Sequence, residues 1–166
     1  MTFFASIPPR VVIVDKPGSP QTQLRVATIG AARSSPDFRP LQVMNIALGG
    51  TLYPHIPDHF GSKVSHRLPP RKPTRHPVRL EGDTLLSRIL GETQVETCSW
   101  HHQAVRQVGE GLRTIAWAAD GVIEAVVAEN HPWCIGVQWH PEMQIGEAPQ
   151  DRLFGAFIEA AQQAGR

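Results

Sequence analysis

A histidine and a glutamate, His140 and Glu142, stand two positions apart at the end of an apolar run, residues 134–139. In a cysteine-based triad an imidazole takes the proton of the thiol, and a carboxylate orients the imidazole. The pair therefore has the residue types for the base and the orienting group of such a triad. The spacing alone fits equally well a strand end with a solvated histidine and glutamate.

Several other runs accompany this pair. They are residues 45–52 with Gly49-Gly50, 98–105 with two adjacent histidines, 109–112, 120–125 with Asp120-Gly121, and 136–142. In order and spacing these runs resemble the second half of class I glutamine amidotransferases, most closely the branch that hydrolyses γ-glutamyl-γ-aminobutyrate. The resemblance covers about residues 43–160. It implies an α/β protein with part of the flavodoxin-like class I amidotransferase fold.

The resemblance also implies a reaction, the hydrolysis of a γ-glutamyl amide by thiolate attack through a thioester. His140 would be the general base and acid, and Glu142 would orient it. Ser99 and His101 would hold the glutamyl end of a small γ-glutamyl compound, and Gln42 would line the same site. For residues 99–103 the alternative is a helix start capped by Ser99, with the histidines facing solvent.

The cysteine nucleophile of that family lies in a Gly-Ile-Cys-Arg-Gly-x-Gln run, which maps by position onto residues 36–42 here. Phe38 replaces the cysteine and Pro40 replaces a glycine. Proline lacks the N–H and the backbone freedom that the turn and the oxyanion hole require, and a phenyl ring cannot attack a carbonyl. We therefore expect an inactive family member. The alternatives are a non-catalytic module that binds glutamate or γ-glutamyl compounds, and a fused gene fragment without selected function.

The N-terminal part has a second resemblance. Residues 10–45, with a Pro17-Gly18 turn and a helix start near Pro36-Asp37, are similar to the later, non-catalytic half of pitrilysin-type zinc proteases. This implies a strand-strand-helix segment over residues 1–42 joined to an amidotransferase-like part over 43–166. It implies no active site in the first segment, since the zinc-binding residues of those proteases lie in their other half. Turn and helix-start chemistry alone would explain the same features.

The two cysteines, Cys98 and Cys134, could form a disulfide, bind zinc with His101 and His140, or be buried thiols. A reducing compartment argues against the disulfide, and the spacing is weaker than that of paired metal-binding motifs. Buried thiols are the default, so we expect no metal and no cofactor. Cys98 is the one thiol worth considering as a replacement nucleophile.

Composition narrows the functional classes. The chain has 166 residues, 41% of them hydrophobic, and a net charge of +1, so it can bury a core but is too neutral for a nucleic-acid groove. Its apolar runs are shorter than the ~20 residues that span a bilayer, and its first residues lack the basic start of a secretion signal. We expect a cytoplasmic protein without nucleic-acid or membrane partners. Because the first strands of the family's sheet are missing, uncovered apolar surface predicts a homo-oligomer.

Apolar periodicity and turn residues predict the elements that position the site. Helices are expected over 37–48, from an Asp83 cap to residue 90, and from an Asp151 cap to about 161. Strands are expected at 11–14, 23–28, 78–80 and 135–139. The hairpin signal Asp120-Gly121 should join strands 112–118 and 122–127. The proline-rich stretch 54–77 is expected to be a loop.

Overall fold

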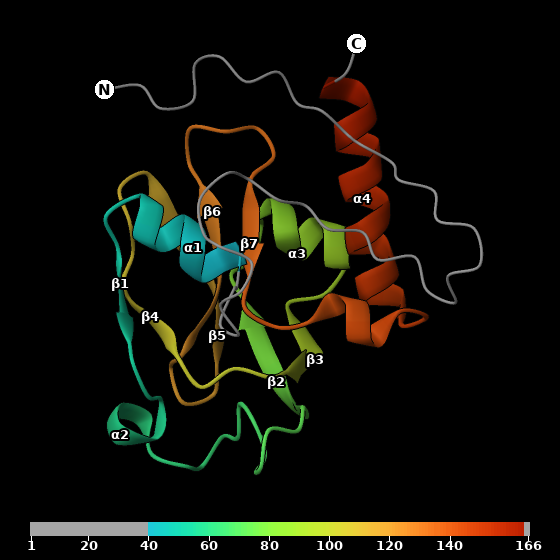
Figure 1. Ribbon diagram of the computed structural model, residues 1–166. Helices are drawn as coiled ribbons and strands as arrows, with labels where there is room; N and C mark the ends of the chain where they lie inside the picture. Colours follow the sequence, from blue (N-terminus) through green and yellow to red (C-terminus); the bar gives the residue numbers. More distant parts are fainter. Residues whose placement is uncertain (1–39, 165–166) are drawn as a thin grey trace, which may run out of the picture.

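The computed structural model describes residues 40–164, and Figure 1 shows their arrangement. The elements, in chain order, are α1 (Pro40–Ala47), β1 (Thr51–Tyr53), α2 (Pro57–Phe60), β2 (Thr74–Leu80), α3 (Leu85–Leu90), β3 (Gln94–Ser99), β4 (Ala104–Gln107), β5 (Leu112–Ala118), β6 (Ile123–Ala128), β7 (Ile135–Val137), the 3-10 helix η1 (Pro141–Gln144) and α4 (Ala148–Ala164). This confirms the α/β class. The strands expected at 11–14 and 23–28, and Phe38, lie outside the described residues.

Five strands form one sheet in the order β3-β2-β5-β6-β7, and β1 pairs with β4 in a second sheet. Every pairing between these strands is antiparallel. The predicted hairpin is confirmed as β5–β6, with Gly121 at a φ of +92° and the Asp120 carboxylate accepting the Val122 N–H at 3.2 Å. This turn fixes the register of the two central strands, from which the rest of the sheet extends.

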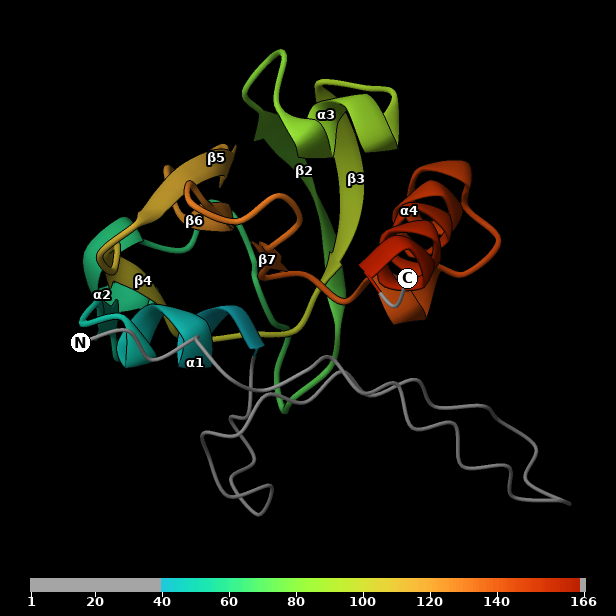
Figure 2. The same cartoon turned by 90° about the horizontal axis from the view of Figure 1, so that it is seen from above.

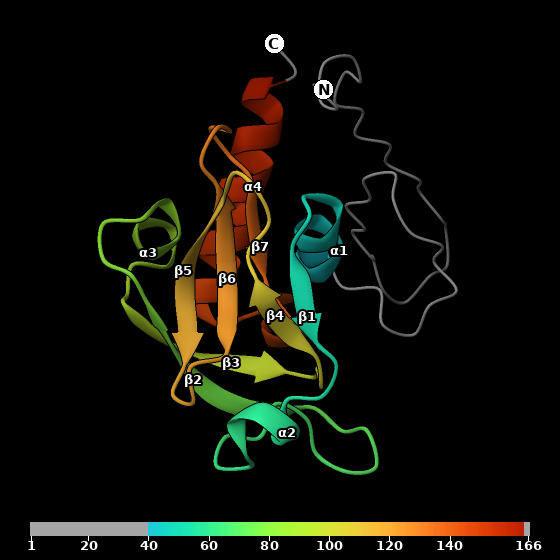
Figure 3. The same cartoon turned by 90° about the vertical axis from the view of Figure 1, so that its left-hand side faces the viewer.

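Helices cover the sheet on both sides. In Figure 3, α1 and α3 lie on opposite sides of the β5-β6-β7 strands, and Figure 2 shows α4 beside β3. The larger core lies on the α3 and α4 side and includes Leu86, Leu90, Ile115 and Trp139. A smaller core lies under α1, with Leu41 packed against Val126 and its neighbours. The helices pack their apolar side chains against these cores, except for Ile46 of α1 and Ile158 of α4, which are 52% and 49% exposed.

Asn45 fixes α1 to the strands. Its side chain is completely buried, donates from Nδ2 to the carbonyls of Thr51 (3.2 Å) and Gln107 (3.0 Å), and accepts the Gly109 N–H at 2.8 Å. A Cβ on Gly109 would come within 2.8 Å of the Asn45 carbonyl, so this glycine is needed for the close approach. Asn45 therefore joins α1 to β1, to β4 and to Gly109 through side-chain hydrogen bonds.

Two predicted helix starts differ from the structure. Thr84, not Asp83, caps α3: its hydroxyl accepts the Ser87 N–H at 3.1 Å, and the Ser87 hydroxyl accepts the Thr84 N–H. Asp83 precedes it with a φ of +58°, outside the geometry of a cap. The last helix begins at Ala148, before Asp151, whose carboxylate accepts the Gly146 N–H at 2.9 Å. Within residues 40–164, the helices are too short or too polar to cross a bilayer.

Candidate active site

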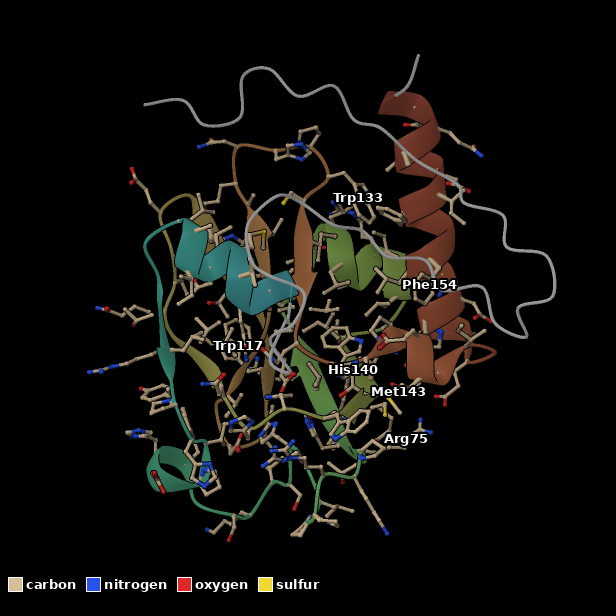
Figure 4. The ribbon with its side chains drawn as sticks, viewed as in Figure 1. Arg75, Trp117, Trp133, His140, Met143 and Phe154 are labelled. Carbon is tan, nitrogen blue, oxygen red and sulfur yellow. The ribbon has the colours of Figure 1, made fainter. Side chains whose placement is uncertain are left out.

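His140 and Glu142 form a hydrogen-bonded pair just beyond the end of β7. The imidazole Nδ1 lies 2.7 Å from the Glu142 Oε1, and the two side chains are 27% and 58% exposed. The His140 backbone N–H donates to the Cys98 carbonyl at 2.8 Å, which ties the pair to β3. Figure 4 shows His140 on the same side of the molecule as Met143 and Arg75. The structure therefore brings together the two residues that the sequence predicts as base and orienting group.

The carboxylate of this pair is ionised at neutral pH. Burial alone would raise the pKa of Glu142, but the hydrogen bond with His140 outweighs burial and lowers that pKa below its ordinary value. An ionised Glu142 accepts the Nδ1–H of His140, which leaves Nε2 as the ring nitrogen that can exchange a proton with a reacting group.

Gln144 fixes the segment that carries this pair, and nothing in the sequence predicts that role. Its side chain is 3% exposed, donates to the Glu96 carbonyl at 3.0 Å and accepts the backbone N–H of Cys98. It also donates to Glu147 at 3.0 Å, and Glu147 binds Arg75 through both carboxylate oxygens. These contacts hold η1 against β3. A buried glutamine three residues after His-Pro gives no signal in composition or periodicity.

Neither thiol of the chain is set up as a nucleophile. Both cysteines are free, which confirms the default of two thiols over a disulfide. Cys98 donates to the Met143 sulfur at 3.7 Å, and Cys134 to the Met44 sulfur at 3.6 Å. Burial raises the pKa of both thiols, so the protonated form dominates at neutral pH. Phe38, at the predicted nucleophile position, lies outside the described residues.

The three predicted substrate residues lie around one loop, residues 100–103. Ser99 is fully buried at the end of β3 and donates to the His66 carbonyl at 2.9 Å. The Gln103 carbonyl faces the other two residues: His101 Nδ1 lies 3.0 Å from it, and Gln42 Nε2 donates to it at 3.1 Å. The loop contains no helix, so the alternative of a helix capped by Ser99 with solvent-facing histidines is wrong for His101. The three side chains hold the loop in place.

His101 also belongs to a cluster that the sequence did not predict. His66, His76, His101 and Glu124, hereafter the buried histidine cluster, are each at most 5% exposed. Their side-chain nitrogen and oxygen atoms, one from each residue, lie within 4.8 Å of one another. His66 was missed because it lies in the proline-rich stretch 54–77, which was expected to be a loop. That expectation was wrong for α2 and for the start of β2, which both lie within the stretch.

The charges in this cluster are coupled. Burial opposes protonation of His66, but the hydrogen bond with Asp120 and the close contact with the Glu124 carboxylate outweigh burial and raise the pKa of His66 to about 9. Burial likewise opposes ionisation of Glu124, yet His101 and His66 lower the pKa of that carboxyl to about 2. Burial lowers the pKa of His101, against the opposing effect of the Glu124 carboxylate. One buried carboxylate thus faces several imidazoles.

Comparisons with known proteins show the family of the chain. A family model described as Peptidase C26 matches residues 38–142. The Mycobacterium tuberculosis protein Rv2859c, a glutamine amidotransferase by name, is 44% identical over 123 residues, which cover 74% of this chain and 38% of the relative. The γ-glutamyl-γ-aminobutyrate hydrolase PuuD of Escherichia coli is 38% identical over 152 residues, 84% of this chain and 59% of the enzyme. The chain thus spans about half the length of such relatives.

A solved structure supports the fold alone. The crystal structure of a GMP synthase-like protein from Thermoplasma acidophilum superposes with a TM-score of 0.54 at 13% sequence identity. The match covers 74% of this chain and 54% of that protein. This confirms the prediction of a partial class I amidotransferase, flavodoxin-like fold for the part of the chain that the structure describes.

Proposed function

Because the chain belongs to the Peptidase C26 family, we propose that it is a γ-glutamyl amide hydrolase-like protein that keeps the proton-transfer pair and lacks the nucleophile. The observation that carries this proposal is the 2.7 Å contact between His140 Nδ1 and Glu142 Oε1. A histidine held in this way can accept a thiol proton and return it to a leaving amine. It cannot by itself form the thioester through which such amides are cleaved.

The missing step is the attack on the amide carbonyl. Phe38 occupies the nucleophile position by its distance from Asn45, and Pro40 follows where the turn needs a glycine. Cys98 comes just before the loop 100–103, which lies beside His140. Its sulfur donates to the Met143 sulfur, however, and its raised pKa disfavours the thiolate. Both observations support a protein with no measurable turnover.

A second candidate function is binding without catalysis, and the loop 100–103 favours it. Trp100 on this loop is 37% exposed, and its ring lies 6.2 Å from that of His140. Ser99, His101 and Gln42 would act on a γ-glutamyl ligand by holding the backbone of the loop, since their own side chains are buried. The expected ligand is a small γ-glutamyl compound or glutamate.

Hydrolysis of γ-glutamyl-γ-aminobutyrate and of glutamine by the purified full chain tests the proposal. We expect no release of product above buffer, and the same for Phe38→Cys, because Pro40 leaves the oxyanion hole unbuilt. Turnover that disappears in Cys98→Ala would refute the proposal and identify Cys98 as the nucleophile. Turnover gained by Phe38→Cys would show that the turn and the oxyanion hole around residue 38 are intact.

Calorimetry with glutamate and γ-glutamyl-γ-aminobutyrate separates the binding module from a fused fragment without selected function. Saturable binding that is lost in His140→Ala, at unchanged thermal stability, supports the module. Binding that is absent in the wild-type chain supports the fragment.

The remaining proposals concern the whole chain. We propose that residues 1–42 come from a pitrilysin-like source joined to the family part, that the protein acts in the cytoplasm, and that it associates with itself. The apolar side chains of Met143 (44%) and Ile145 (73%), close together in the sequence after His140, are exposed and support the last point. Light scattering should give a dimer or a larger species, and a monomer would contradict it. Sequencing of the source gene across codons 36–52 tests the join.

A further inference from the structure

The buried histidine cluster has the donors, the spacing and the supporting contacts of a metal site. We propose that His66, His76, His101 and Glu124 bind one divalent transition-metal ion, and that Zn²⁺ is the ion they suit best. The site is distinct from the His140–Glu142 pair, and the proposal does not rest on the function proposed for that pair.

The first argument is distance. The Glu124 Oε1 lies 3.1 Å from His66 Nδ1, 3.6 Å from His76 Nε2 and 3.4 Å from His101 Nε2. Ligand atoms about 2.0–2.1 Å from a tetrahedral Zn²⁺ are about 3.3 Å apart. The three distances from the carboxylate to the rings are therefore close to the edges of such a tetrahedron, and all four ligand atoms lie within 4.8 Å of one another, which requires some side-chain adjustment around an ion.

The second argument is that these same atoms have no hydrogen bonds. Among the described residues, His66 Nδ1, His76 Nε2, His101 Nε2 and both Glu124 oxygens are buried without a partner in hydrogen-bond geometry. Each buried polar atom left unsatisfied costs about 1–3 kcal/mol. One metal ion would satisfy all three nitrogens and the carboxylate at once.

The third argument is the outer contacts. The remaining ring nitrogen of each histidine faces an acceptor: His66 Nε2 lies 3.0 Å from the Asp120 carboxylate, His76 Nδ1 3.3 Å from the Pro77 carbonyl, and His101 Nδ1 3.0 Å from the Gln103 carbonyl. Metal-binding histidines almost always donate their second N–H to a carboxylate or carbonyl in this way. When a metal ion displaces the second proton of His66, these acceptors fix the tautomers so that the three other nitrogens point their lone pairs into the cluster.

Charge and donor type select the ion. Glu124 and Asp120 bring two carboxylates into a buried region, and a dication balances both. Three imidazoles and one carboxylate suit Zn²⁺, whereas Mg²⁺ and Ca²⁺ prefer oxygen ligands. Four protein ligands, each nearly or fully buried, leave no open position for water or substrate, which is typical of a structural site.

The ion would join four separate segments. His66 lies between α2 and β2, His76 on β2, His101 in the loop before β4, and Glu124 on β6. Because the His101 ring also fixes the Gln103 carbonyl, the ion would hold the loop whose Trp100 lies beside His140. We therefore infer that the metal stabilises the fold and the wall of the candidate active site.

Zn²⁺ binding by the chelator-treated full chain tests this. We expect one Zn²⁺ per chain by calorimetry and metal analysis, a higher melting temperature with Zn²⁺ than with chelator, and an X-ray absorption spectrum with imidazole and oxygen ligands only. The absence of saturable Zn²⁺ binding would overturn the proposal. Sulfur in the spectrum would also overturn it, because it would place the ion at Cys98 or Cys134.

Variants locate the site. Glu124→Gln should abolish the stoichiometric binding. Asp120→Asn keeps the acceptor for the Val122 N–H of the β5–β6 turn and should weaken Zn²⁺ binding about 10–100-fold. His131→Ala, which removes an exposed histidine, is the matched control and should bind as the wild type does. Should Glu124→Gln fail to fold, Asp120→Asn still decides: affinity equal to that of His131→Ala would refute the site.

Discussion

Replacing Asn45 by alanine should destabilise the protein by about 3 kcal/mol. The Asn45 side chain makes three hydrogen bonds, two to backbone carbonyls and one from the Gly109 N–H, and each such bond contributes about 1 kcal/mol net. Gly109 is buried, so its N–H would remain without a partner and dominates the cost.

The expected loss of stability comes from the Asn45 hydrogen bonds and not from a weaker helix. Alanine has the highest helix propensity, so α1 itself should not be weakened by the substitution. Ile46→Ala is the matched control, because Ile46 is the next residue of the same helix and is 52% exposed. We expect this control within about 0.5 kcal/mol of the wild type.

Urea unfolding followed by tryptophan fluorescence measures both variants. The slope of the free energy against urea should stay constant while the midpoint of Asn45→Ala falls, since the surface exposed on unfolding is unchanged. A single domain has a total stability of about 5–15 kcal/mol, so a loss of about 3 kcal/mol is easily resolved. An Asn45→Ala midpoint equal to that of Ile46→Ala would refute the stabilising role of the Asn45 hydrogen bonds.

Three further predictions concern the cap, the thiol and the pair. Thr84→Ala should cost about 1 kcal/mol in thermal or urea unfolding, whereas Asp83→Gly should be neutral or stabilising because residue 83 has a positive φ; the reverse order would restore Asp83 as the cap. Cys98 should react with iodoacetamide at pH 7 far more slowly in the folded than in the urea-unfolded chain, because burial raises its pKa; equal rates would contradict this. The pKa of Glu142 is lower in the folded than in the unfolded chain, so its hydrogen bond with His140 stabilises the fold above the unfolded-state pKa. This stabilisation is lost as the pH falls through the folded-state pKa. Glu142→Gln should therefore flatten the acid side of the curve of stability against pH, by less than about 1 kcal/mol because the group is half exposed, and an unchanged curve would refute the contribution.

Local signals in the sequence were sufficient for the elements that depend on few residues. Asp120-Gly121 predicts the β5–β6 hairpin because a type of turn with positive φ needs a glycine there, and the strands on each side alternate correctly. The α3 helix was predicted from its apolar stripe and from Gly91, which adopts a φ of +73° at its end. Its start was wrong by one residue, since Asp83 and Thr84 are both good caps and only the backbone geometry distinguishes them.

The candidate pair was predictable because both members lie in one short run. His140 and Glu142 are two residues apart, so a single local conformation brings them together. Gln144 was not predictable, because its partners Glu96 and Cys98 are on β3, far away in the sequence. The sequence analysis also did not predict that every pairing between the described strands is antiparallel.

The buried histidine cluster shows what sequence spacing cannot reveal. Metal motifs are recognised when ligands repeat at short intervals, but His66, His76, His101 and Glu124 are separated by 10, 25 and 23 positions. They meet because β2 pairs with β5, β5 pairs with β6, and the loop after β3 folds back over them. His101 links the two regions: the resemblance assigns it to the substrate pocket, and the structure places its ring against Glu124. Both assignments agree if His101 Nδ1 positions the loop at the pocket through the Gln103 carbonyl while His101 Nε2 faces Glu124.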